Sequence, residues 1–182
     1  MRRHAVTLAL FAAVVALATD MIRTEAAGLR FAVPRTWDRV PAASDFRAAQ
    51  WKLHPVAGER EDTEVVLFFF GKGKGGSVEE NLERWYGQFS EPDGRTARDA
   101  AVVTIRTVNG LRVTAVDLPG TYKPGQMPSG PLPPPKRDYR MLAAVIEGED
   151  GPWFLKMTGP QRTIAAAKPD FDAVLASLTP HR

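Results

Sequence analysis

One dipeptide constrains the fold of this chain more than any other feature. Asn109-Gly110 separates two runs rich in β-branched and apolar residues, 102–108 and 111–118. Both residues of the dipeptide accept positive φ, which a tight two-residue hairpin turn requires. The sequence therefore predicts two long strands that pair antiparallel.

Five further strands are predicted from their apolar patterns. Apolar and polar residues alternate at 29–33, and a similar segment follows at 46–53. The run 65–70 is apolar throughout, which is typical of a strand covered on both faces, although a buried helical segment has the same pattern. Residues 139–146 and 153–157 are predicted to form a second hairpin.

Two helices are predicted, one in the middle of the chain and one near its end. Ser77 and Glu80 have the spacing of a capping box, and Val78, Leu82, Trp85 and Phe89 follow at helical spacing. Pro169 suits the first position of the second helix. Its expected inner face consists of Phe171, Val174, Leu175 and Leu178. The order of elements predicts an α+β domain with a mainly antiparallel sheet of about six or seven strands sandwiched by helices.

The amino terminus has the pattern of a secretory signal peptide. Basic residues precede a weakly polar to apolar run at 5–18, which is too short to span a bilayer. Cleavage is expected after Ala18 or after Ala26, which makes 1–26 the signal segment and leaves no transmembrane span in the mature chain; an uncleaved anchor is the alternative. Residues 27–182 then form a single domain, exported to the periplasm or the cell exterior, with a proline-rich loop at 123–138.

Composition excludes several classes of function. The chain has no cysteine, so disulfides, thiolate metal sites and thiol nucleophiles are excluded. Its formal net charge of +3 is too small to indicate nucleic-acid binding. We expect no cofactor and no metal.

Several motifs resemble a family of uncharacterised exported bacterial proteins whose layout is similar to the PsbP/Mog-like fold. They are Phe31-Ala-Val-Pro34 with Trp37, the glycine-rich segment 69–78, Asn81-Leu82-x-Arg84-Trp85, Gly120-Thr121-Tyr122, and the segment 151–160. The resemblance covers nearly all of residues 29–179. It implies an antiparallel sheet sandwiched by helices and a binding or accessory role, and it brings no catalytic residues.

The glycine-rich turn before the first helix is the best candidate binding site. Gly71, Gly73 and Gly76 match G-x-G-x-x-G, but the second parallel strand and its acidic residue are missing, and Ser77 stands where a P-loop has lysine. Backbone amides, lysines and a hydroxyl at a helix start can still hold an anion. The predicted contacts are Lys72, Gly73, Lys74, Gly75, Gly76 and Ser77. A tight turn that needs glycine for its backbone is the structural alternative.

Other candidate sites are weaker. Trp37 and Trp153 could offer an aromatic contact surface, with core packing as the alternative. No catalytic residue is assigned, because His54 is the only histidine in the body of the chain and G-x-S-x-G is absent. The sequence thus predicts an exported, non-enzymatic binding or accessory domain that recognises a small anionic ligand or an envelope protein. A small hydrolase using a pair of carboxylates is the alternative.

Overall fold

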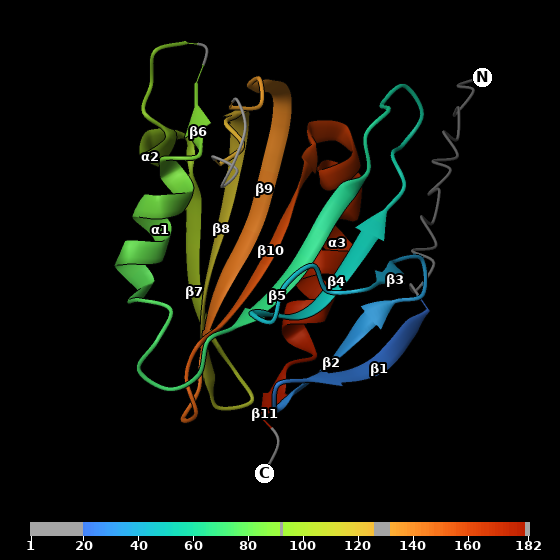
Figure 1. Cartoon of the computed structure of the whole chain (residues 1–182), viewed down its shortest axis with the longest axis vertical. Helices are drawn as coiled ribbons and strands as arrows, with labels where there is room; N and C mark the ends of the chain where they lie inside the picture. The colour runs from blue at the N-terminus through green and yellow to red at the C-terminus, as the bar shows by residue number, and fades with distance from the viewer. Residues whose placement is uncertain (1–19, 92, 126–131, 181–182) are drawn as a thin grey trace, which may run out of the picture.

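A large antiparallel sheet forms the body of the protein (Figure 1). The computed structural model describes residues 20–91, 93–125 and 132–180. In chain order, the elements of the described residues are β1 (Met21–Ala26), β2 (Leu29–Pro34), β3 (Asp38–Val40), β4 (Arg47–Leu53), β5 (Thr63–Phe69), α1 (Val78–Tyr86), β6 (Phe89–Ser90), α2 (Ala97–Ala100), β7 (Val102–Val108), β8 (Leu111–Tyr122), β9 (Lys136–Glu147), β10 (Trp153–Pro160), α3 (Gln161–Ala176) and β11 (Thr179–Pro180).

The strand order confirms the predicted α+β class. The main sheet runs β3-β4-β5-β10-β9-β8-β6, with β7 also paired to β8, and every pair is antiparallel. A small second sheet has the order β1-β2-β11. There are more strands than the six or seven predicted, because strands of two or three residues such as β6 and β3 are too short to show an alternating pattern.

The Asn109-Gly110 hairpin has the predicted geometry. The two turn residues have φ values of 49° and 87°, and Val108 pairs with Leu111 beside the turn. The second hairpin, β9 with β10, is also present. β8 continues beyond the predicted end at Leu118 to Tyr122.

Both faces of the sheet are covered, and each has its own hydrophobic core. Successive side chains of a strand point to opposite faces, so on β9 Leu142 and Ile146 pack on the α3 side, whereas Met141 and Val145 pack on the side of α1 and α2. All four side chains are 0–1% exposed. Full burial of such a side chain contributes roughly 1.5–3 kcal/mol to stability. Since both faces are buried, the sequences of the central strands are almost continuously apolar. Figure 1 shows α3 behind the sheet.

The first helix begins where predicted and ends earlier than predicted. Ser77 and Glu80 form the capping box. The helix ends at Tyr86, and Phe89 belongs to β6 instead of the helix. Phe89 is nevertheless 3% exposed and packs in the same core as Leu82 and Trp85, because a strand that turns back onto the sheet can bury the residue equally well.

The predicted start of the last helix is wrong. α3 begins at Gln161, and Pro169 lies inside it. No side chain next to the first turn caps this helix. The carboxylate of Glu59 does so from a distant loop, accepting the backbone N–H of Arg162 at 2.9 Å and that of Thr163 at 2.7 Å. A cap contributed from about a hundred residues away leaves no local sequence pattern.

The boundaries of two predicted segments also change. β9 begins at Lys136, so the end of the proline-rich 123–138 segment is strand rather than loop, and residues 126–131 lie outside the described residues. Met21–Ala26 forms β1, paired along its length with β2, so the folded part begins before residue 27. The predicted leader run 5–18 and Ala18 lie outside the described residues. Within the described part of the chain, no helix has the length and apolar character needed to cross a bilayer.

Candidate functional site: a polar groove around Lys156

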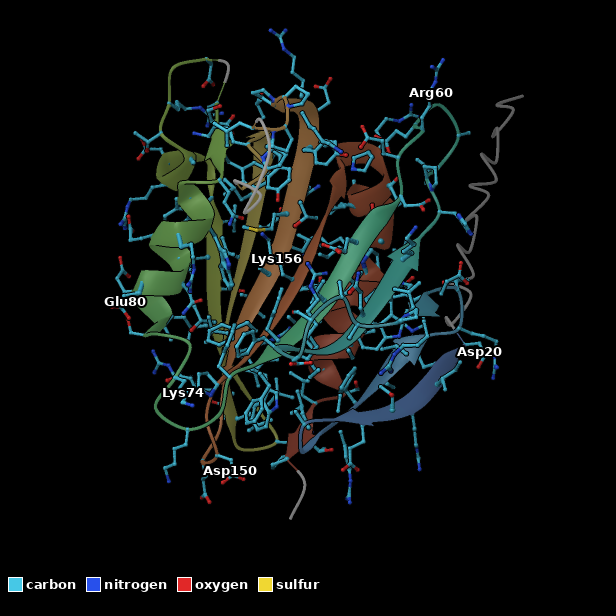
Figure 2. All side chains as sticks on the ribbon, in the orientation of Figure 1. Asp20, Arg60, Lys74, Glu80, Asp150 and Lys156 are labelled. Atoms are coloured by element: carbon cyan, nitrogen blue, oxygen red, sulfur yellow. The ribbon has the colours of Figure 1, made fainter. Side chains whose placement is uncertain are left out.

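The structure gathers the predicted anion contacts into one turn between β5 and α1. Gly71, Gly73, Gly75 and Gly76 all have positive φ, between 72° and 89°. An L-residue with a side chain is strained in this region, so the backbone path itself accounts for the four glycines. The side chains of Lys72 and Lys74 are exposed, and Lys74 lies in the loop below α1 (Figure 2).

The helix start at this turn is already occupied by groups of the chain itself. Glu80 accepts the backbone N–H of Ser77 at 2.7 Å, and Ser77 Oγ accepts the N–H of Glu80 at 3.2 Å. These hydrogen bonds with Ser77 lower the pKa of the Glu80 carboxyl, so the group is charged at neutral pH. A carboxylate thus sits where an external anion would bind. Recognition of an anion by Lys72, Lys74 and Ser77 stays a prediction.

The two candidate aromatic contacts lie inside the protein. Trp37 is 4% exposed and Trp153 is 3% exposed, and both belong to the core on the α3 side. The indole N–H of Trp153 donates to the carbonyl of Ala27 at 2.9 Å, and its ring stacks on Phe69. Neither ring is a surface platform.

A polar groove opens on the other face of the sheet, beside the part that α1 covers. It has a volume of about 280 Å³. Its lining comes from β4, β5, β8, β9, β10 and the β4–β5 loop. The residues are Arg47, Glu61, Asp62, Glu64, Val66, Phe68, Tyr122, Lys136, Tyr139, Lys156 and Thr158. Lys156 projects over the middle of the sheet in Figure 2, well away from Lys74.

Lys156 differs from the other cations of this groove in its partner. Its Nζ donates to the neutral amide oxygen of Gln88 at 2.6 Å and lies 5.8 Å from the ring centroid of Tyr122. No salt bridge to Lys156 occurs among the described residues. An ammonium group has three N–H donors. Among the described residues, that of Lys156 contacts one neutral acceptor and one aromatic ring.

Burial lowers the pKa of Lys156 to about 8, because removal of water disfavours the charged form. The nearby carboxylate of Glu64 opposes this shift, and the positive charges of Arg84 and Arg47 add to it. Lys156 is therefore still mainly protonated at neutral pH, in surroundings that stabilise its charge poorly.

The carboxylates of the groove, by contrast, already have partners. Glu64 accepts from Arg47 at 2.7 Å and from Gln50 at 2.9 Å. Glu61 accepts from Lys136 and from the hydroxyl of Tyr139. These contacts lower the pKa of Glu61. The negative charges are thus satisfied within the protein, and the positive charge of Lys156 is not.

This groove could not be assembled from the sequence, although one signal for it exists. Its parts come from segments as far apart as Arg47 and Thr158, which only the strand order brings together. The local signal is Lys156 itself, which interrupts the segment Trp153–Met157. A lysine in the middle of an otherwise apolar buried strand indicates a site or a paired charge. No group of three His, Cys, Asp or Glu side chains in the described ranges is arranged to hold a metal ion.

Comparison with known proteins supports the fold. No protein-family model matches the sequence, and no curated protein sequence is significantly similar to it. The cyanobacterial PsbP protein CyanoP of Synechocystis sp. PCC 6803 is similar in structure, with a TM-score of 0.52 and 16% identity over 93% of this chain and 97% of CyanoP. PA94 of Pseudomonas aeruginosa, a protein of unknown function, has a TM-score of 0.50 and 14% identity over 89% of this chain and 98% of its own. The chain is thus similar to PsbP-like proteins in its fold.

Proposed function

We propose that this protein is an exported, non-enzymatic binding domain that takes up a small organic anion in the groove around Lys156. A single observation carries the proposal. The half-buried Lys156 places its ammonium group in a cavity of about 280 Å³, where a neutral amide is its hydrogen-bond partner, while the neighbouring carboxylates are paired with other groups. An anionic ligand would supply the missing countercharge and offset the cost of burying the ammonium.

The lining of the groove defines the class of ligand. Tyr122 stacks on Tyr139 with ring centroids 5.8 Å apart, and Phe68 also borders the groove. These rings suit a planar or apolar ligand body. Glu61 and Glu64 lie in the same lining and repel a second negative charge. We therefore favour a monocarboxylate or similar monoanion with an apolar body over a highly charged phosphate.

The alternative, a hydrolase that uses two carboxylates, has less support. A general acid requires a carboxyl group whose pKa is raised. The pKa of the groove carboxyl Glu61 is lowered by hydrogen bonds from Lys136 and Tyr139. Burial raises the pKa of Glu59, but hydrogen bonds from Thr163 and Arg162 outweigh that effect and lower it overall. Both observations favour binding over acid catalysis.

Export and membership of the exported PsbP/Mog-like family remain part of this proposal. Of the two predicted cleavage sites, the one after Ala18 leaves β1 (Met21–Ala26) whole, whereas cleavage after Ala26 would remove it from β2. We therefore expect a mature chain that begins at Thr19. Mass spectrometry of the protein recovered from the envelope of its host or a related bacterium checks this, and a mature start at Ala27 would contradict it.

Titration calorimetry tests the binding proposal. Benzoate, as an apolar monocarboxylate, and inorganic phosphate are titrated into the protein at pH 7. Loss of a hydrogen bond to a charged group costs about 1.5–3 kcal/mol, so Lys156→Met is expected to weaken benzoate binding by roughly 10- to 150-fold. Lys168→Met, on the opposite face of the sheet, serves as the matched control and is expected to bind like the wild type.

The rival site is tested in the same experiment. The double variant Lys72→Ala/Lys74→Ala is expected to bind benzoate within twofold of the wild type. Loss of binding in this variant, with retention in Lys156→Met, would move the site to the glycine-rich turn. Absence of binding by either anion to the wild-type protein at millimolar concentration would reject anion recognition altogether.

A further inference from the structure

We propose that two copies of this chain associate through β7, joining their main sheets into one continuous antiparallel sheet. The first observation is the exposure of this strand. Every residue of Val102–Thr107 is exposed to solvent, and three of them are apolar: Val102 at 62%, Val103 at 40% and Ile105 at 59%. A long strand of β-branched residues is rarely left exposed on both faces in a monomer, and such a strand is usually covered by a partner.

The outer edge of β7 has no partner among the described strands. β7 pairs with β8 on one side, and the short β6 takes up only the far end of β8, at Thr121 and Tyr122. The helices pack mainly on other strands, α1 on β6 and β8, α2 on β8, and α3 on β2, β9 and β10. The strand also lacks the usual features that prevent edge pairing, since it has no proline, no lysine and no bulge, and a single charge at Arg106.

The hairpin turn determines which backbone groups face outward. In a two-residue hairpin the residues beside the turn, here Val108 and Leu111, form a hydrogen-bonded pair, and such pairs alternate along the strands. The backbone groups of every second residue back from Val108 therefore point toward β8. Those of the intervening residues, Val103, Ile105 and Thr107, point away from the sheet. These three residues form the free hydrogen-bonding edge.

This edge is complementary to itself. A twofold axis through Ile105 pairs Ile105 with Ile105 of the second copy, and Val103 with Thr107 of the second copy. Each is then a hydrogen-bonded pair that exchanges two backbone hydrogen bonds. The cross-strand neighbours are β-branched, which is the favourable combination on a sheet surface. No shift of register is needed to satisfy all three outward residues in both copies.

The charge of the strand is compatible with this register. Arg106 falls opposite Thr104 of the second copy, so like charges do not lie directly opposite each other. Thr104 lines the same small hollow as Asp172 of α3, so the guanidinium of Arg106 approaches a carboxylate of the other copy that is shared with Lys168. A second copy of the same chain therefore satisfies hydrogen bonding, packing and charge together.

Sedimentation velocity between 10 µM and 1 mM tests the association. The wild-type protein is expected to change reversibly from monomer to dimer with concentration. Ile105→Lys places two positive charges opposite each other at the axis, and we expect it to raise the dissociation constant at least tenfold. Phe46→Lys changes another exposed apolar residue, 58% exposed and outside β7, and should dimerise like the wild type.

A cross-linking experiment tests the register, since the chain has no cysteine of its own. Ile105→Cys brings two thiols to the axis, where paired Cα atoms are about 5.5 Å apart and within disulfide reach. Val102→Cys places them about 20 Å apart along the strands. Rapid oxidation to a dimer is expected for the first variant alone. A monomeric wild type at 1 mM, a dimer that Ile105→Lys does not weaken, or equal cross-linking of the two variants would each overturn the proposal. None of these readouts depends on Lys156.

Discussion

The glycine-rich turn and the Lys156 groove both place lysines next to α1, yet their lysines have different surroundings. Lys72 and Lys74 are exposed to solvent on a turn whose helix start is already capped by Glu80. Lys156 is held in a cavity with a neutral partner, and its pKa is lowered by burial. Water screens the charges of Lys72 and Lys74 well and the charge of Lys156 poorly. The comparison teaches that burial and missing countercharge, rather than the number of basic residues, indicate an anion site.

The largest expected effect tests whether the turn is structural. Gly75 has a φ of 89°, and a Cβ atom there would lie 2.7 Å from the ring of Phe154. Gly75→Ala is therefore expected to lower the free energy of unfolding by about 3 kcal/mol, combining backbone strain with overpacking. Urea denaturation measures it. Gly73 also has a positive φ, 72°, but a Cβ atom there would have nothing within 4 Å, so Gly73→Ala should lower the free energy of unfolding by about 1 kcal/mol. Equal costs would mean that the Phe154 contact is unimportant.

The pH dependence of anion affinity separates the two sites next. An anion in the groove binds protonated Lys156, so affinity is full below pH 8 and falls as the pH rises above the pKa of about 8. Between pH 7 and 9.5 the expected loss is about 30-fold. Burial raises the pKa of Tyr122, the aromatic neighbour of Lys156, so its ionisation does not interfere. Calorimetry at four pH values measures this loss, and an affinity that stays constant between pH 7 and 9.5 would place the anion outside the groove.

Stability gives a third distinction. If Lys156 serves to bind a ligand, its desolvated charge destabilises the unliganded fold. Lys156→Met is therefore expected to raise the free energy of unfolding by about 1–2 kcal/mol. The unfolded chain holds the Lys156 proton more tightly, so wild-type stability should rise with pH between about 8 and 10.5. The variant should lack this rise. Lys72→Met, the exposed counterpart, should change stability by less than about 0.5 kcal/mol. A loss of stability in Lys156→Met would indicate a structural lysine.

The smallest effect concerns the helix start beside the turn. Ser77→Ala removes the side chain that accepts the N–H of Glu80 and should lower the free energy of unfolding by about 1 kcal/mol. Thermal denaturation measures this, with Ser77→Thr as the control that keeps a hydroxyl. Benzoate affinity should not change in either variant. A change in affinity would place the ligand at the helix start and would contradict binding in the groove.

Local patterns predicted local structure well. The Ser77–Glu80 capping box and the Asn109-Gly110 turn each lie within a few residues, and both occur as predicted. The antiparallel class of the main sheet followed from the two predicted hairpins. The start of α3 was missed because its cap, Glu59, comes from a distant loop. β1 (Met21–Ala26) was missed because it adjoins the leader-like amino terminus.

The candidate site was predicted less well than the fold, for the same reason. A turn rich in glycine and lysine is visible in six consecutive residues. The groove instead requires that Lys156 on β10 lie beside Val66 on β5, and that β5 lie beside Arg47 on β4. Such neighbours are properties of strand order, which short-range patterns do not contain.

The Glu59 cap makes the order of folding events in this chain predictable. The first turn of α3 obtains its hydrogen-bond acceptor only when the loop after β4 has reached it, across 103 residues of sequence for Arg162. α1 needs no such contact, because its cap lies within its own first turn. Contacts between distant residues form late, since closing a long loop costs entropy. In pulse-labelling hydrogen exchange, the amides of α1 should therefore become protected before those at the amino-terminal end of α3.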